Sequence, residues 1–215
     1  TNTAYVINGQ PVNDMENGRV YWSNWMGLID LTSSVQIQRG LGSTSLAVPS
    51  AGGTVSVNTR AAEVDPGSGI KMSIGDNSYP KFTAFHNTGV NELGWSSSFL
   101  LGFWQGDGWR NGMQGEGTTY AFSVGYTPRG GNHEFNFSLI GAGQWHHQAY
   151  YGTQLQDYLD YGPIQGDDFR KFNALYGDYQ GEEFSILRNY YNKPLATFNW
   201  DWEISSRVTL ATSLY

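Results

Sequence analysis

The sequence contains no cysteine and few charged residues. Charged side chains make up 14% of the 215 residues, and 19 Asp and Glu outnumber 12 Lys and Arg, which gives a formal net charge of -7. The absence of cysteine excludes disulfide bonds, thiolate metal ligands and cysteine nucleophiles. A surface that binds nucleic acid needs clustered basic residues, whereas the basic residues here are scattered. Nucleic acid is therefore not expected as a partner.

Long hydrophobic runs are also missing. No run of about 18 apolar residues occurs, and Thr1 does not begin a basic segment followed by an apolar one, so neither a transmembrane helix nor a signal peptide is predicted. A strand of a transmembrane barrel needs only about 10 residues that alternate between apolar and polar. A membrane-spanning β-barrel is thus compatible with this composition.

Glycine and aromatic residues, by contrast, are abundant. The chain has 28 glycines and 15% aromatic residues, which favours a mostly β protein. After Ser68, an apolar face alternates with a face of Ser, Thr, Asn and Gly, and Trp or Tyr recur near the ends of the runs. Seven strands are predicted, at 69–74, 79–87, 93–105, 118–127, 133–145, 195–204 and 207–215. The uncharged polar face favours a transmembrane β-barrel over a soluble β-sandwich, which stays the alternative.

The connections between these strands alternate in length. Short connections at 87–91, 129–132 and 205–206 fall on one side, if the first strand runs away from that side. The other side carries a three-residue turn at 75–77, the loop 106–117 and a long segment from His146 to Pro194. Outer-membrane barrels have short periplasmic turns and longer external loops, so this pattern also favours a barrel.

The first 60 residues form a smaller, mixed pattern. A short strand ends at an Asn8-Gly9 turn, and Trp25, Leu28 and Ile29 have the spacing of one apolar helix face. Two further strands follow, at 34–39 and 53–58, with small residues between them.

The stretch "SVQIQRGLGSTSLAVPSAGGTVSVNTR" at 34–60 resembles the end of the plug domain of TonB-dependent outer-membrane receptors. In that family a strand ends in Arg-Gly, and Gly-Gly begins a last strand that ends in Thr-Arg or Thr-Lys. "VINGQPVND" looks like the plug's strand, turn and strand. Together, "NGQPVNDMENGRVYWSNWMGL" and the aromatic "QWHHQ" at 144–148 are most similar to receptors of the Bacteroidetes type. Two departures are "AVPS" at 47–50, where the family commonly has Tyr-Gly, and the missing aspartate-rich signature of the polysaccharide-importing branch. The residues that match the plug motif are Asn8, Gly9, Arg39, Gly40, Gly42, Gly52, Gly53 and Arg60.

The resemblance implies a fragment of such a receptor. Residues 1–64 would be the C-terminal part of the plug, and residues 65–215 the first strands of a barrel. A plugged transporter barrel has about 22 strands, so seven strands cannot close one. The segment that contacts TonB, the first plug strands and most of the barrel would then lie outside this chain.

Arginine residues end both of the plug strands. The family's plug is similar in placing arginines against glutamates of the inner barrel wall, and a shielded Arg–carboxylate contact is stronger than an exposed one. Glu134 and Glu203 lie on the lumen-facing phase of neighbouring strands, near the end with short turns. Arg39 or Arg60 is therefore expected to pair with Glu134 or Glu203 and to lock the plug; solvated charges without direct contact are the alternative.

The long loops combine aromatic and acidic residues. Such a surface could bind a substrate through stacking and carboxylate contacts, although a simply solvated loop is the alternative. The residues proposed to bind substrate are Trp109, Tyr150, Tyr151, Asp157, Tyr158 and Tyr161. His146 and His147 are adjacent on a strand and point to opposite faces, so no metal site is expected.

These features together predict a non-enzymatic transporter. Sequence motifs of hydrolases, metalloproteases and P-loop proteins are missing, and no cofactor is expected. The resemblance implies TonB-dependent, plug-gated transport of an unidentified substrate across the bacterial outer membrane, with TonB, membrane lipid and, in some assemblies, a surface lipoprotein or larger complex as partners. A soluble extracellular β-sandwich that binds glycans, and a barrel with a purely structural role in an outer-membrane assembly, are the alternatives.

Overall fold

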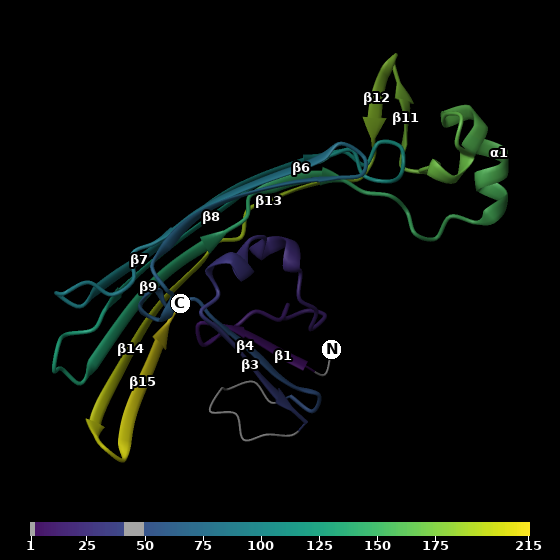
Figure 1. The fold of residues 1–215 in the computed structure, drawn as a ribbon. Helices are drawn as coiled ribbons and strands as arrows, with labels where there is room; N and C mark the ends of the chain where they lie inside the picture. Colours follow the sequence, from purple (N-terminus) through teal and green to yellow (C-terminus); the bar gives the residue numbers. More distant parts are fainter. Residues whose placement is uncertain (1–2, 41–49) are drawn as a thin grey trace.

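The computed structural model describes residues 3–40 and 50–215, and strands dominate it (Figure 1). A small N-terminal unit, residues 3–40 and 50–64, lies against the concave side of one large curved sheet (Figure 1). Gly42 of the plug motif and Ala47 to Pro49 lie outside the described residues.

Four strands form the sheet of the N-terminal unit. They are β1 (Thr3–Ile7), β2 (Gln10–Pro11), β3 (Ser34–Arg39) and β4 (Gly53–Asn58), in the order β2-β1-β4-β3. β1 and β4 are parallel, whereas the other two pairs are antiparallel. Asn8 and Gly9 connect β1 to β2 with φ values of 49° and 88°, as a type I′ turn requires.

Three short 3₁₀ helices complete this unit, namely η1 (Trp22–Trp25), η2 (Leu28–Leu31) and η3 (Ala61–Glu63). The sequence predicts that Trp25, Leu28 and Ile29 share one apolar helix face. This prediction is wrong for Ile29, whose side chain is 87% exposed. In a 3₁₀ helix, residues three apart are aligned, so Leu31 rather than Ile29 shares the buried face with Leu28.

The large sheet confirms the seven predicted strands. They are β5 (Gly67–Gly75), β6 (Tyr79–Asn87), β7 (Trp95–Gly106), β8 (Gly115–Tyr126), β9 (His133–Gly141), β14 (Leu195–Ser205) and β15 (Val208–Leu214). Each is antiparallel to its neighbours, in the order β15-β14-β9-β8-β7-β6-β5.

Two of these strands continue further than predicted. β10 (Gln144–His147) keeps the register of β9 against β8, and β13 (Arg188–Tyr191) keeps the register of β14 on the other side. The segment predicted as a connection from His146 to Pro194 is therefore shorter, because strand pairing resumes at Arg188. Pro194 lacks a backbone N–H, which accounts for a break in the ladder before β14.

The connections at the two ends of the sheet differ in size. Short turns lie at the end where β14 meets β15, and the large loops lie at the other end (Figure 1). The longest connection holds α1 (Leu155–Gln165), η4 (Phe169–Lys171) and a hairpin of β11 (Tyr176–Tyr179) and β12 (Glu182–Ser185). Over residues 3–40 and 50–215, no helix is long and apolar enough to cross a membrane.

The polar face of the large sheet is the face that the N-terminal unit covers. Ser98, Ser123 and Ser138 are nearly fully buried there, whereas Phe99 and Leu101 on the opposite face are exposed. A β-sandwich would bury the apolar face of this sheet instead.

One hydrophobic cluster joins the two parts of the molecule. Leu100 of β7 is 1% exposed and departs from the polar pattern of its face. The cluster consists of Ile7, Leu28, Leu31, Val57, Leu100, Ala121 and Ile140, of which the last three come from the large sheet. The core of the N-terminal unit is therefore completed by residues of the sheet against which it lies.

Candidate functional site

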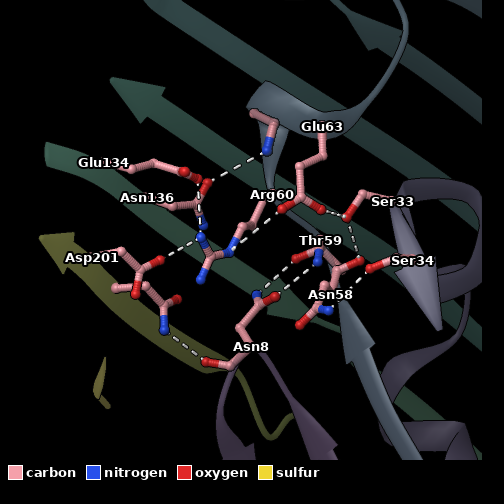
Figure 2. A network of polar contacts seen from close by, with 12 residues as sticks. Asn8, Ser33, Ser34, Asn58, Thr59, Arg60, Glu63, Glu134, Asn136 and Asp201 are labelled. Carbon is pink, nitrogen blue, oxygen red and sulfur yellow. Dashed lines mark hydrogen bonds and ion pairs between the residues drawn. The ribbon is translucent and has the colours of Figure 1, made fainter. Parts of the chain in front are cut away.

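Arg60 follows β4 and connects the N-terminal unit to two strands of the large sheet. Its Nη1 lies 3.0 Å from Glu134 Oε1 on β9 and 2.5 Å from Asp201 Oδ2 on β14 (Figure 2). A third carboxylate, that of Glu63, is 3.9 Å from Arg60 Nε, and its Oε2 accepts a hydrogen bond from Ser33. Arg60 is thus surrounded by three carboxylates, of which two belong to the large sheet.

The sheet places the two wall carboxylates directly opposite each other. Glu134 and Asp201 are register partners on the antiparallel pair of β9 and β14. Like charges in such positions destabilise a sheet, and a guanidinium between them offsets the repulsion. Burial alone would lower the pKa of Arg60, but hydrogen bonding and the charges of Asp201 and Glu134 outweigh burial, so the pKa is raised above its usual value.

Among the four pairings expected from the sequence, the structure contains the one between Arg60 and Glu134. Arg39 is exposed and makes no ion pair with any residue that the structure describes, and Glu203 is exposed as well. Sequence reasoning missed Asp201, which lies on the same face as Glu203. Alternation places both residues on this face, and only the register between β9 and β14 singles out Asp201.

The Asn8-Gly9 turn of the plug motif lies against the same wall. Asn8 Nδ2 donates to Thr59 Oγ1 at 2.7 Å, and Asn8 Oδ1 accepts from the Thr59 backbone N–H at 2.8 Å (Figure 2). Asn199 of β14 donates from Nδ2 to the Asn8 carbonyl at 2.9 Å. A Cβ on Gly9 would lie 2.6 Å from Ser213 Oγ of β15, so the close approach of the wall requires glycine there.

The other glycines of the motif differ in their surroundings. Gly53 has a φ of +115°, and a Cβ on it would lie 2.3 Å from the Gln38 carbonyl oxygen, so the hairpin geometry demands glycine. Gly40 has a φ of +71°, and no atom of the described residues lies within 4 Å of where its Cβ would be, while Gly52 is exposed just before β4.

Three of the proposed substrate-binding residues line one pocket in the long loop. This outer pocket has a volume of about 480 Å³ and lies between α1 and the segment 172–177. Its lining includes Tyr150, Asp157 and Tyr161, together with Phe172 and Gln165. Asp157 also accepts the backbone N–H of Gln154 at 3.0 Å, which stabilises the first turn of α1.

The remaining three candidates lie beside cations of the loops. The Arg110 guanidinium is 6.0 Å from the ring centre of Tyr151 and 5.7 Å from that of Tyr158. Trp109 faces the Lys171 ammonium at 5.5 Å. These aromatic residues are therefore tied to the loop by cation–π contacts, and the structure does not bring them into the outer pocket.

Asn173 fastens the long loop to the loop 106–117. It is completely buried, and its Nδ2 donates to the carbonyls of Asn111 at 2.9 Å and Gln148 at 3.2 Å. Gln165 donates to the Asn173 carbonyl at 2.8 Å, which connects α1 to the same centre. The outer pocket therefore stands on a hydrogen-bonded base rather than on an isolated loop.

A second pocket, which sequence reasoning missed, lies between the N-terminal unit and the large sheet. This inner pocket has a volume of about 420 Å³ and joins the segment 14–24 to strands β10 and β13. The adjacent histidines separate here, since His146 lines the pocket while His147 contacts the Gly112 carbonyl at 3.2 Å. The two parts of its lining are far apart in sequence, so no local motif indicates it.

Comparison with solved structures identifies this arrangement. The chain superposes on the ferric-catecholate import receptor Fiu from E. coli K12 with a TM-score of 0.61 and 15% identity, over 97% of this chain and 30% of that one. The siderophore receptor PiuA from Acinetobacter baumannii gives 0.60 and 13%, over 98% and 28%. FpvA from P. aeruginosa, solved with bound pyoverdine, gives 0.62 and 9%, over 98% and 27%.

The fold is that of a TonB-dependent outer-membrane receptor. In the terms of this fold, the N-terminal unit is the plug and the large sheet is part of the barrel wall. The chain spans about 30% of the length of these receptors, which places it on the plug and the adjoining strands. No family model matches the sequence, and no curated protein matches it either.

Proposed function

We propose that this chain is part of a plug-gated transporter of the bacterial outer membrane, driven by TonB. The single observation that carries the proposal is Arg60, which holds the plug to Glu134 and Asp201 of the wall. An ion pair that closes a passage has to be strong enough to hold and weak enough to be released by an external pull. One partly exposed guanidinium shared by two carboxylates meets both conditions.

The polar character of the contact between plug and wall supports the same function. The plug covers the uncharged polar face of the sheet through small side chains such as Ser98 and Ser138. Outside the apolar cluster that includes Leu100, Ala121 and Ile140 of the wall, these small polar contacts can be exchanged for water at lower cost than apolar contacts. The exposed apolar face of the same strands suits contact with lipid, which supports a location in the outer membrane.

The partners follow from this function. TonB would act on the plug, and a surface lipoprotein or larger complex would bind at the loop end. The outer loops, with Tyr150, Asp157 and Tyr161 around the outer pocket, are the proposed first contact for substrate. The chemistry is binding and gated passage, with no catalytic step.

The test compares cells that carry the full-length gene with cells that lack it, each with and without TonB. Mass spectrometry of the medium measures which compounds the cells remove. We expect at least one compound to be removed only when both the receptor and TonB are present. Removal that depends on the receptor but not on TonB, or no removal that depends on the receptor, would contradict the proposal.

A further inference from the structure

The outer pocket combines aromatic rings with one carboxylate. Tyr150, Tyr161 and Phe172 supply the rings, Ile164 adds an aliphatic side chain, and Asp157 is the only charged residue in the described part of the chain that lines the pocket. The volume of about 480 Å³ is within the range of pockets that bind small ligands. A ligand that enters therefore meets apolar surface and a single negative charge.

The helix α1 places the carboxylate and one of the rings side by side. Asp157, Tyr161 and Ile164 are successively four and three residues apart, so they share one face of the helix. Phe172 is buried, and its ring stacks on that of Tyr161 with 6.1 Å between the ring centres and 26° between the ring planes. Tyr150, which precedes α1, is exposed, as Tyr161 is. Two accessible rings and one covered ring thus line the pocket together with one carboxylate.

The amide and the threonine hydroxyl of the lining are already hydrogen-bonded. Gln165 donates from Nε2 to the carbonyls of Asn173 and Tyr176, at 2.8 and 2.7 Å, and its Oε1 accepts from the Asn173 backbone N–H at 3.0 Å. Thr153 donates from Oγ1 to the Tyr150 carbonyl at 3.0 Å. These groups hold the loop together and leave the recognition of a ligand to the rings and the carboxylate.

Asp157 keeps one carboxylate oxygen for a ligand. Its Oδ2 accepts the Gln154 backbone N–H at 3.0 Å, whereas no residue that the structure describes donates to its Oδ1. The surrounding segment 150–187 is acidic, with seven Asp and Glu against Arg170 and Lys171. An anion would be repelled here, and an uncharged apolar ligand would cover the carboxylate without replacing the water that it loses. A positively charged group on the ligand removes both difficulties.

The rings of the outer pocket have no cation of their own, unlike the rings beside them. Tyr151 and Tyr158 each face the Arg110 guanidinium. In the part of the chain that the structure describes, no Lys or Arg faces a ring of the outer pocket in this way. Several aromatic faces around one carboxylate form the kind of cage that binds alkylated ammonium groups.

We propose that the outer pocket binds an apolar cation, in which an ammonium group carries several alkyl or aryl substituents. The inference rests on the proposed transport function, because it names the class of compound that the outer loops bind first. The substituents pack on the rings of Tyr150 and Tyr161, and the positive charge lies beside Asp157 Oδ1.

The experiment measures binding to the purified full-length receptor in detergent by titration calorimetry. The probes are benzyltrimethylammonium, benzyl alcohol and benzenesulfonate, which share one aromatic ring and carry a positive charge, no charge and a negative charge. We expect benzyltrimethylammonium to bind about tenfold more tightly than the other two, or better. Asp157→Asn should weaken its binding about tenfold, because this change removes the charge and keeps an oxygen for the Gln154 N–H. Tyr161→Leu should weaken it by about as much, because it removes one ring and keeps an apolar side chain.

Asp160→Asn is the matched control, because Asp160 lies on the same helix, is exposed and does not line the pocket. Binding of benzyltrimethylammonium should be unchanged in this variant. The inference is overturned if benzyltrimethylammonium does not bind, if either of the other probes binds equally well, if Tyr161→Leu leaves binding unchanged, or if Asp157→Asn and Asp160→Asn weaken binding equally. Removal of a compound from the medium that depends on TonB is measured without these probes and would still support the transport function in each of these cases, so the two proposals fail separately.

Discussion

At the scale of single residues, Arg60 is the side chain on which the plug contact depends. It neutralises two carboxylates that face each other across β9 and β14, and it comes from a different part of the chain. Arg39 carries the same charge at the end of β3, but it is exposed and has no described ion-pair partner. The two arginines therefore form a natural comparison between a contact and a solvated charge.

We expect Arg60→Gln to loosen the plug by about 1.5–3 kcal/mol, the range for hydrogen bonds to charged groups. The replacement removes the cation and leaves Glu134 and Asp201 opposed without compensation. Hydrogen exchange of backbone amides at residues 53–64 measures the effect, and it should become about tenfold faster or more. Arg39→Gln is the control and should leave exchange in this segment unchanged.

Arg60→Lys sharpens this test. It keeps the charge but has a single point of contact, so it should restore only part of the protection. Equal exchange rates for Arg60→Gln and Arg39→Gln would show that the Arg60 contacts do not hold the plug.

Asp201, which sequence reasoning missed, shows where sequence information ends. Asp201 and Glu203 share one face of a strand, and alternation alone cannot distinguish them. Which of them meets Arg60 depends on the register between β14 and β9, in which Asp201 lies opposite Glu134. A period of two predicts the face of a residue but not its position along the wall.

At the scale of elements, the β1–β2 turn is the part of the plug most closely fitted to the wall. Gly9 combines a φ of +88° with the approach of Ser213 from β15, whereas Gly40 has a φ of +71° and meets no atom of the part of the chain that the structure describes. Both glycines occupy the left-handed region, so a side chain strains the backbone at either position. Gly9 differs from Gly40 in that it lies against the wall.

We therefore expect Gly9→Ala to destabilise the plug by about 1–3 kcal/mol more than Gly40→Ala, as is usual for overpacking. The difference is measured by thermal unfolding of the full-length receptor, with the protease sensitivity of the plug as the readout. Ser213→Gly should recover part of the loss caused by Gly9→Ala, because it removes the hydroxyl that the new methyl group meets. A Gly40→Ala variant as unstable as Gly9→Ala would contradict the fit described for this turn.

The elements themselves were predictable to different degrees. Strands with strict alternation, such as the run at 118–127, were predicted closely because one face meets the plug and the other does not. α1 was not predicted, since it contains Gly162 and Pro163, which normally interrupt helices. Its stability comes from tertiary contacts, with Tyr158 and Tyr161 packed on Phe172, and such contacts leave no periodic signal.

At the scale of the whole molecule, the plug and the wall form one folded unit. Leu100, Ala121 and Ile140 of the wall complete the hydrophobic cluster of the plug, and η3 places Ala61, which is fully buried, against the wall. The proposed function requires the plug to move away from this wall.

A disulfide between plug and wall tests that claim directly, because the chain has no native cysteine. The Cβ of Ala62 lies 3.5 Å from the position that a Cβ would take on Gly125, a distance typical of disulfides. The Ser96 hydroxyl lies 2.5 Å from that position, so Ser96→Ala is included in every variant. The two single-cysteine variants are the controls.

The measurement is the TonB-dependent removal of the transported compound by cells that carry Ala62→Cys and Gly125→Cys together. We expect removal to stop when the disulfide is formed and to return after a reducing agent is added, with both single variants active throughout. Continued removal while the disulfide is intact would contradict the claim that the plug must leave the wall.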